Sequence, residues 1–433
     1  MCTTQSEFLE EPPKPTLRAT RSLGADPVAG ERSGLQVAAV CSIEGLEGLG
    51  PEWQNLFERS KCASVFLSFE WMSEWWKSWG DRRNLFIVTV RDTGGDLVGL
   101  AALSINVPVL GRLGPASVRF IADEFVGSDY LDLLVDPAFP SSVPEAVARF
   151  LLQSKERWDY LCFSHCQDSP LLSALRMQMR GGGMIERSRP DSICPYISLP
   201  VSFEVYLGEI GAKLRKNFRR GYRSLQQKGQ LDFRTVTEAA EMERRFEDLI
   251  RLHRLGFAAN KVESSFLLPA PLRFHKEVVK RLVVRGWARL YVLEMDGRPI
   301  GALYGFAIAG KFSFYQSGRD PDWNRFEVGH VLNGLCIEQA IKGGHHEFDF
   351  LRGGEHYKTK WARHSRVTVS IYFFDRRFKS QLALLRFHAG RELRSLSRGL
   401  RRLGTMFQRG PEPSAIPGVR AGDEQPRRSD MTQ

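Results

Sequence analysis

One stretch, residues 311–361, indicates the fold most clearly. It reads KFSFYQSGRDPDWNRFEVGHVLNGLCIEQAIKGGHHEFDFLRGGEHYKTKW. Its first ten residues alternate as a strand does and end in turn residues. After a loop, VLNGLCIEQAIKGG carries apolar residues mostly at helical spacing, and EFDFL (347–351) predicts a second, short strand. This order of strand, loop, helix and strand indicates an α/β layout, in which ligands lie at strand ends and helix N-termini.

The second of these strands leads into two glycines and a dense polar cluster, RGGEHYK (352–358). Alternation places the Asp349 side chain on the face opposite Phe348 and Phe350. A partly buried carboxylate there suits proton transfer from an amine or hydroxyl acceptor, with Lys358 holding Asp349 or an anionic substrate group. The alternative is structural, with Asp349 capping the turn that follows it and Lys358 pairing with it.

Composition indicates a globular protein of ordinary class. The chain has 433 residues, of which 42% are hydrophobic, so we expect two domains with sizeable cores. No apolar run approaches the length of a membrane span, and no secretory signal precedes the first domain. The seven cysteines are scattered without a CxxC pair, which predicts free thiols and a cytoplasmic location.

The order of elements occurs twice. LFIVTVRDTGGDLVGLAAL (85–103) and RLYVLEMDGRPIGALY (289–304) both predict a hairpin with an acidic-Gly turn. WDYLCF (158–163) resembles EFDFLR (347–352), and each follows a helical stretch. The chain is therefore interpreted as two copies of one fold. We expect a disordered tail over 1–35, a first domain over 36–195, a second over 196–379, a basic amphipathic helix over 380–409 and a disordered tail over 410–433.

The two copies differ in their chemical residues. The late helix of the first copy, 141–152, has no glycine near its start, and the first copy has no counterpart of the GGEHYK cluster. Its nearest match, SHCQDSP (164–170), contains Cys166, which we interpret as a small buried side chain and not as a nucleophile. We therefore assign the chemistry to the second copy.

A basic segment joins the copies. One or two helices are predicted over 203–227, and they carry Lys213, Arg215, Lys216, Arg219, Arg220 and Arg223. A nucleic-acid patch and a solvated face that attracts an anionic ligand are the two interpretations. The second is favoured, because aromatic residues for base stacking are sparse here.

Four motifs carry a family resemblance: LRKNFRR (214–220), LEMDGRPIGALY (293–304), FYQSGRDPDW (314–323) and DFLRGGEHYKTKW (349–361). They resemble the GNAT acyltransferases, and more narrowly the cellulose-biosynthesis (CelD/BcsL-like) acetyltransferases, distant relatives of the FemABX peptidyltransferases. The resemblance covers about 196–375, with a weaker first copy. It implies an α/β (α+β) fold of two tandem GNAT-like domains, each a mixed central sheet flanked by helices.

The resemblance also implies a coenzyme A site. A bulged strand over 314–318 would offer backbone N–H groups to the thioester carbonyl, and a glycine-containing helix N-terminus would bind the pyrophosphate. An acidic Glu327 beside that pyrophosphate is unfavourable unless its side chain points away. The implied cofactor-binding residues are Phe314, Gln316, Ser317, Gly318, Arg325, Val328, Gly329, His330 and Val331.

The implied reaction is acyl transfer from acetyl-CoA or another acyl-CoA to an amine or hydroxyl of a small molecule or saccharide precursor. Tyr357 or Tyr315 would return a proton to the departing thiolate. The catalytic candidates are thus Asp349, Lys358, Tyr357, Glu355 and Tyr315. FemABX-like aminoacyl transfer and a non-catalytic ligand-binding protein are the alternatives. His345, His346, Asp349 and His356 match no common zinc spacing, so we expect no metal site.

The C-terminal segment is strongly basic. Apolar residues step by three and four along 380–409, arginines fill the other face, and the formal charge of the chain is +11. Such a helix binds an anionic membrane surface, docks on a protein partner or packs on its own domain.

Overall fold

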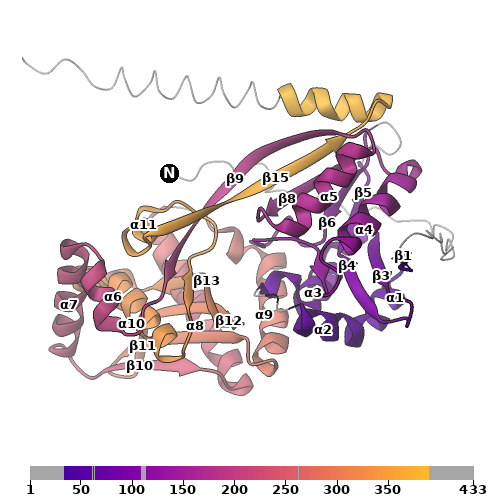
Figure 1. The fold of residues 1–433 in the computed structure, drawn as a ribbon. Coiled ribbons are helices and arrows are strands. Elements are labelled where there is room, and N and C mark those ends of the chain that lie inside the picture. Colours follow the sequence, from indigo (N-terminus) through magenta and orange to yellow (C-terminus); the bar gives the residue numbers. More distant parts are fainter. Residues whose placement is uncertain (1–33, 61, 63, 109–113, 262, 390–433) are drawn as a thin grey trace, which may run out of the picture. The chain divides into compact units, whose positions relative to one another are not determined.

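The computed structural model describes residues 34–389, apart from 61, 63, 109–113 and 262 (Figure 1). The described residues up to Gln381 form one compact unit, and the described residues from Leu382 belong to another. We refer to residues 34–198 as the N-terminal half of the first unit and to residues 199–381 as its C-terminal half.

The N-terminal half alternates helices and strands. Its elements are β1 (Gln36–Val40), α1 (Ile43–Gly48), α2 (Gly50–Arg59), η1 (Val65–Leu67), α3 (Phe69–Trp79), η2 (Gly80–Arg82), β2 (Asn84–Leu85), β3 (Ile87–Arg91), β4 (Leu97–Ala101), β5 (Leu103–Asn106), β6 (Ser117–Phe120), β7 (Leu134–Val135), α4 (Ser142–Gln153), η4 (Lys155–Arg157), β8 (Tyr160–Cys166), α5 (Pro170–Gly181) and β9 (Ile185–Ser198).

The C-terminal half repeats this order after two connecting helices. Its elements are α6 (Phe203–Glu209), α7 (Ala212–Gln226), β10 (Leu231–Val236), α8 (Ala239–Ala259), η5 (Ser265–Leu267), α9 (Pro269–Val284), β11 (Ala288–Met295), β12 (Arg298–Ile308), β13 (Lys311–Arg319), η6 (Pro321–Phe326), α10 (Val328–Lys342), β14 (Glu347–Asp349), α11 (His356–Trp361) and β15 (His364–Phe374).

The duplication inferred from the sequence is confirmed. Both predicted hairpins form, as β3–β4 and as β11–β12. In each half a later strand is followed by a helix and then by a parallel partner strand: β6 pairs with β8 across α4, and β13 pairs with β14 across α10. The fold is the expected mixed α/β architecture in two copies.

The two halves exchange a strand. The larger sheet has the order β10-β11-β12-β13-β14-β9-β15-β8-β6-β5-β2. Thus β9, from the N-terminal half, pairs with β14, and β15, from the C-terminal half, pairs with β8. The two exchanged strands lie side by side as long antiparallel partners (Figure 1). Because of this exchange, the halves share one hydrogen-bonded sheet. The predicted domain boundary at 195/196 falls inside β9.

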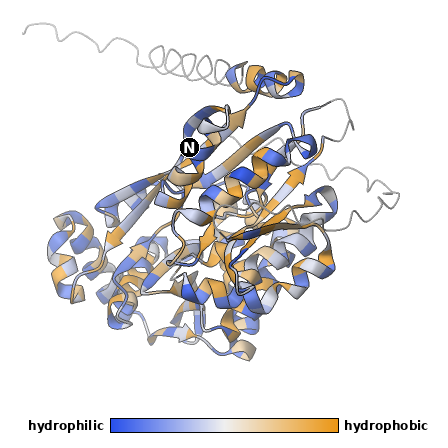
Figure 2. Cartoon of the chain, turned by 45° about the vertical axis from the view of Figure 1, so that its right-hand side comes forward, coloured by the Kyte–Doolittle hydropathy of each residue, from blue (hydrophilic) through white to orange (hydrophobic). Residues whose placement is uncertain are grey.

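Apolar packing also joins the halves. One core cluster extends from α3 of the N-terminal half to α8 and α9 of the C-terminal half. Trp71 of α3 packs edge-on against Phe274 of α9, with ring centroids 4.9 Å apart. The aromatic helix α3, FEWMSEWWKSW, is therefore part of the core. A second cluster lies between the C-terminal sheet and α6, α7 and α10. In Figure 2 the hydrophobic colour gathers along the strands, as these clusters require.

The chain ends, in the described part, in a helix over 378–389. It coincides with the start of the predicted basic helix, whereas residues 390–409 and both predicted tails, except residues 34 and 35, lie outside the described residues. None of the helices among the described residues has the length and apolar character needed to cross a membrane.

Candidate active site

The site is built where β13 and β14 separate. The two strands pair in parallel only from Lys311–Glu347 to Ser313–Asp349. Beyond this point β13 continues along β12 to Arg319. The chain after β14 instead follows β9, since the Phe350 N–H donates to the Pro195 carbonyl over 2.9 Å. We call this divergence the splay, with a β13 arm and a β14 arm.

The β13 arm has the expected bulge. Gln316 is paired with Tyr304 and Phe314 with Gly305, so Tyr315 is the extra residue. The Tyr315 hydroxyl accepts a hydrogen bond from the Gly127 N–H of the N-terminal half over 3.2 Å and lies 3.1 Å from His275 Nε2. Burial raises the pKa of Tyr315. The phenol therefore stays protonated at neutral pH. Its hydrogen bond with the Gly127 N–H joins β13 to the N-terminal half.

Two glycines in this region have different surroundings. A Cβ at Gly318 would collide with the backbone of Leu252 and His253, so the close packing of α8 accounts for this glycine. A Cβ at Gly329 would meet only the Arg319 side chain, at an ordinary 3.5 Å. Gly329 is therefore free of backbone crowding, as an approach of ligand to the helix start requires.

The N-terminus of α10 is left open to a ligand. No side chain caps it, and none of the described residues accepts a hydrogen bond from the Val328 or Gly329 N–H. The N–H groups of His330 and Val331 both donate to the Glu327 carbonyl, over 2.8 and 3.0 Å. The Glu327 carboxylate lies 3.6 Å from Arg220 Nη2 of α7 and 4.0 Å from His330 Nε2 of α10.

Cations surround this helix start. A Cβ at Gly221 would collide with the Phe326 carbonyl, so α7 packs tightly against η6 and brings its arginines beside α10. The Arg325 guanidinium lies 4.7 Å from the Phe326 ring centroid. Burial lowers the pKa of His330, the charge of Glu327 opposes this shift, and the charges of Lys360 and Arg319 lower the pKa further. A helix N-terminus flanked by cations favours bound anions.

Asp349 occupies the base of the splay. It is fully buried, and Phe348 and Phe350 belong to the C-terminal core, so the predicted alternation is confirmed. One carboxylate oxygen accepts from the Leu351 N–H over 2.7 Å, and the other lies 2.7 Å from Lys311 Nζ. Both oxygens therefore have partners within the protein.

The partners of Asp349 form an ion cluster that the sequence analysis missed. Lys311 also lies 3.3 Å from Glu347, and Arg366 lies 2.6 Å from Glu347 and 4.0 Å from Asp349. Both cations lie over the Tyr130 ring of the N-terminal half, at 4.4 and 5.4 Å. The sequence held no local signal for this cluster, because it depends on the register that places Lys311 opposite Glu347 on adjacent strands.

Lys358 is placed differently from the prediction. Its Nζ donates to the Arg352 carbonyl over 2.7 Å and pairs with Glu355 at 3.1 Å, so it supports the turn after β14 and does not pair with Asp349. Tyr357, on the same helix, is 36% exposed, and its ring centroid lies 6.5 Å from that of Phe314. Tyr357 is thus beside the β13 arm and accessible. Among the described residues no cluster of His, Cys, Asp or Glu is placed to hold a metal ion.

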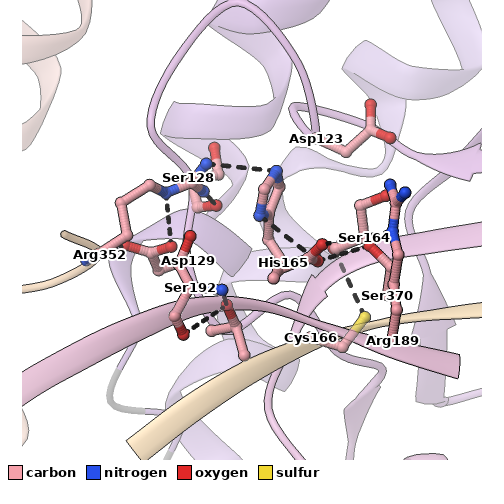
Figure 3. A network of polar contacts seen from close by, with 12 residues as sticks. Asp123, Ser128, Asp129, Ser164, His165, Cys166, Arg189, Ser192, Arg352 and Ser370 are labelled. Atoms are coloured by element: carbon pink, nitrogen blue, oxygen red, sulfur yellow. Dashed lines mark hydrogen bonds and ion pairs between the residues drawn. The ribbon is translucent and has the colours of Figure 1, made fainter. Parts of the chain in front are cut away.

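A polar network on the β14 arm reaches into the N-terminal half (Figure 3). Arg352 Nε donates to Asp129 Oδ1 over 2.7 Å, and the Arg352 N–H donates to Asp129 Oδ2 over 2.9 Å. A second guanidinium nitrogen donates to the Ser128 carbonyl, and Nη1 lies 3.2 Å from His165 Nε2. None of these N-terminal residues was expected in the site. Ser128 and Asp129 are in a loop and His165 is on β8, and the sequence does not reveal that these segments lie at the splay.

Comparisons with known proteins agree with this geometry. Residues 212–359 match the family model described as Acetyltransferase (GNAT) domain. No curated protein sequence matches the chain significantly. The solved structure of FemX aligns with a TM-score of 0.55 at 11% identity, over 77% of this chain and 97% of FemX. A tandem GNAT protein from the clavulanic acid biosynthesis pathway aligns with a TM-score of 0.39 at 14% identity, over 78% and 98%.

The likeness to FemX concerns the fold alone, since the identity is low. The family match covers the stretch that contains the bulge, the splay and the open helix start. The C-terminal half of the chain therefore contains a GNAT acetyltransferase domain over residues 212–359, and this domain indicates that the protein is an acyltransferase.

Proposed function

We propose that the protein transfers an acyl group from acetyl-CoA or another acyl-CoA to an amine or hydroxyl of a small molecule or saccharide precursor. The observation that carries this proposal is the start of α10. It combines two unbonded N–H groups, a glycine without backbone crowding and flanking cations, directly after a bulged strand in the matched domain. These are the features that bind a diphosphate.

The residues at the start of α10 fit the diphosphate of coenzyme A. The Val328 and Gly329 N–H groups would hold the pyrophosphate, with Arg319 and Arg325 adding positive charge. When bound, acyl-CoA supplies the acyl group as a thioester. The backbone of β13 from Phe314 to Gly318, which contains the bulge, would orient the acyl carbonyl.

Proton transfer is assigned to the exposed part of the site. Tyr357 is accessible beside the β13 arm, and Glu355 starts the same helix. Asp349 is buried, and both of its oxygens are engaged, so we give it the alternative role considered above, that of a structural anion at the base of the splay.

The test is calorimetric titration with CoA. The wild type should bind CoA, and Arg319→Gln should weaken binding, because it removes a cation beside Gly329. Lys342→Gln is the matched control, since Lys342 is a cation at the opposite end of the same helix. Absence of binding to the wild type at millimolar CoA would refute the proposal, and equal effects of the two variants would place the ligand elsewhere.

A second candidate is aminoacyl transfer of the FemABX kind. It is favoured by the alignment with FemX over nearly the whole of that chain. This candidate requires no affinity for CoA, so the same titration separates the two. The narrower cellulose-biosynthesis resemblance favours a saccharide acceptor, which an acetylation screen of saccharide precursors with the purified protein would test.

A further inference from the structure

A loop of the N-terminal half contacts both arms of the splay. The Gly127 N–H donates to the hydroxyl of Tyr315, the bulged residue of the β13 arm, over 3.2 Å. The next two residues, Ser128 and Asp129, accept hydrogen bonds from Arg352 of the β14 arm. Three consecutive residues of one half therefore bridge the two strands of the other half at the point where they separate.

Arg352 and Asp129 are joined by two hydrogen bonds, which fix their relative orientation. Both carboxylate oxygens of Asp129 are used, one by the side chain and one by the backbone of Arg352. The Asp129 side chain is completely buried, whereas that of Arg352 is 27% exposed. Charge-assisted pairs with two contacts fix orientation as well as distance. Asp129 thus restrains the side chain and the main chain of the β14 arm together.

We call the contacts that Arg352 makes with Ser128, Asp129 and His165 the clamp, and His165 is its third residue. Because a guanidinium can only donate, His165 Nε2 must accept from Arg352, which assigns the proton to Nδ1. The backbone N–H of His165 donates to Asp191 Oδ2 over 3.0 Å, and Ser370 Oγ lies 2.5 Å from the same oxygen. Asp191 is on β9, and Ser370, which is labelled in Figure 3, is on β15, so the clamp is anchored in the exchanged strands.

We propose that Asp129 and His165 are positioning residues of the acyl-transfer site, which hold Arg352, and with it the β14 arm, at a fixed distance from the bulge of β13. The inference rests on the proposed function of the splay. It gives the N-terminal half a part in the reaction, although its own copy of the site is not used. Displacement of reacting groups by about 1 Å can cost on the order of a hundredfold in rate, so such a clamp matters for turnover.

The experiment compares Asp129→Asn with Asp136→Asn in the full chain. Asp136 also pairs with an arginine, Arg59 at 2.9 Å, but within the N-terminal half. Asp129→Asn should speed amide hydrogen exchange of residues 352–354 and 315–317 by about tenfold, whereas Asp136→Asn should leave these amides unchanged. Turnover on the acceptor found in the screen should fall at least about tenfold in Asp129→Asn, with the calorimetric Kd for CoA within about twofold of the wild type.

A second variant covers the case in which Asp129→Asn does not fold. Arg352→Lys keeps the charge but loses the fork, and it should reproduce the exchange and turnover effects. Unchanged exchange in both variants, or a loss of CoA affinity equal to the loss of turnover, would overturn the inference. The exchange measurement needs no ligand, so failure of the wild type to bind CoA would refute the proposed function without deciding the clamp.

Discussion

The two halves share a fold but differ in the region that follows their parallel strand pair, β6–β8 or β13–β14. In the N-terminal half, β6 and β8 also pair in parallel at two positions. Beyond them lies a buried ion network, in which Asp123 contacts Arg119 at 2.6 Å and Arg83 at 3.1 Å. In the C-terminal half the corresponding region holds the bulge and the splay. One copy fills this position with paired charges, whereas the other combines the ion cluster around Asp349 with the bulge and, as proposed above, a ligand site.

The helices that follow differ in the same sense. The first turn of α4 contains Pro144, which has no N–H, and Glu145, whose charge disfavours an anion. The first turn of α10 contains Gly329 and no acid, and the acidic N-cap residue Glu327 is paired with Arg220. The two helix N-termini therefore differ in the backbone donors and positive charge that they offer. This difference favours α10 as the proposed anion site.

The largest expected effect concerns the buried carboxylates of the two halves. Asp349→Asn and Asp123→Asn each remove one anionic partner of buried cations, which then keep only Glu347 or Glu124, so each should lower the free energy of unfolding by up to about 3–5 kcal/mol. Urea denaturation measures this loss. A stable Asp349→Asn variant with turnover reduced a hundredfold would instead restore Asp349 as a proton acceptor.

The two glycines of the site should separate structure from ligand. Gly318→Ala collides with the α8 backbone and should cost about 1–3 kcal/mol of stability. Gly329→Ala has room and should leave stability unchanged, whereas Gly329→Val should weaken CoA binding by about 1–3 kcal/mol, by analogy with strain at special backbone sites. Urea denaturation and calorimetry report the two effects. Destabilisation by Gly329→Ala would show that this glycine is also needed for packing.

The clamp predicts a pH effect on stability. Burial, and then the Arg352 charge, lower the pKa of His165 to about 4, while Asp191, Asp129 and Asp123 oppose the shift. The unfolded chain therefore binds a proton near pH 6.5 that the folded chain does not, so stability falls as the pH decreases from about 6.5 to about 4. His165→Gln should reduce this slope by up to one proton in urea titrations at several pH values. An unchanged slope would mean that other histidines account for it.

The smallest effect on folding is expected from the C-terminal segment. Truncation after Gln381 removes a separate compact unit and should change the thermal transition little. If the basic segment 380–409 binds anionic surfaces, truncation should abolish sedimentation with anionic vesicles, because each basic residue near such a surface contributes about 1 kcal/mol. Loss of the folded state would show that the segment belongs to the core.

Much of this arrangement was predictable from local patterns. Periodicity gave both hairpins, the helix α10 and the side of β14 on which Asp349 lies. The strand exchange and the loop at Gly127–Asp129 were not predictable, because they depend on contacts between residues far apart in the chain. The pairing of Lys311 with Asp349 was missed for the same reason, since it requires the register between β13 and β14.

We propose that one helix N-terminus of the duplicated pair binds the acyl donor, and hydrogen exchange with and without CoA is the sharpest test. We expect CoA to protect amides 328–331 at the start of α10 and to leave those at 142–145, at the start of α4, unprotected. Protection at α4, or no protection at either helix, would contradict it.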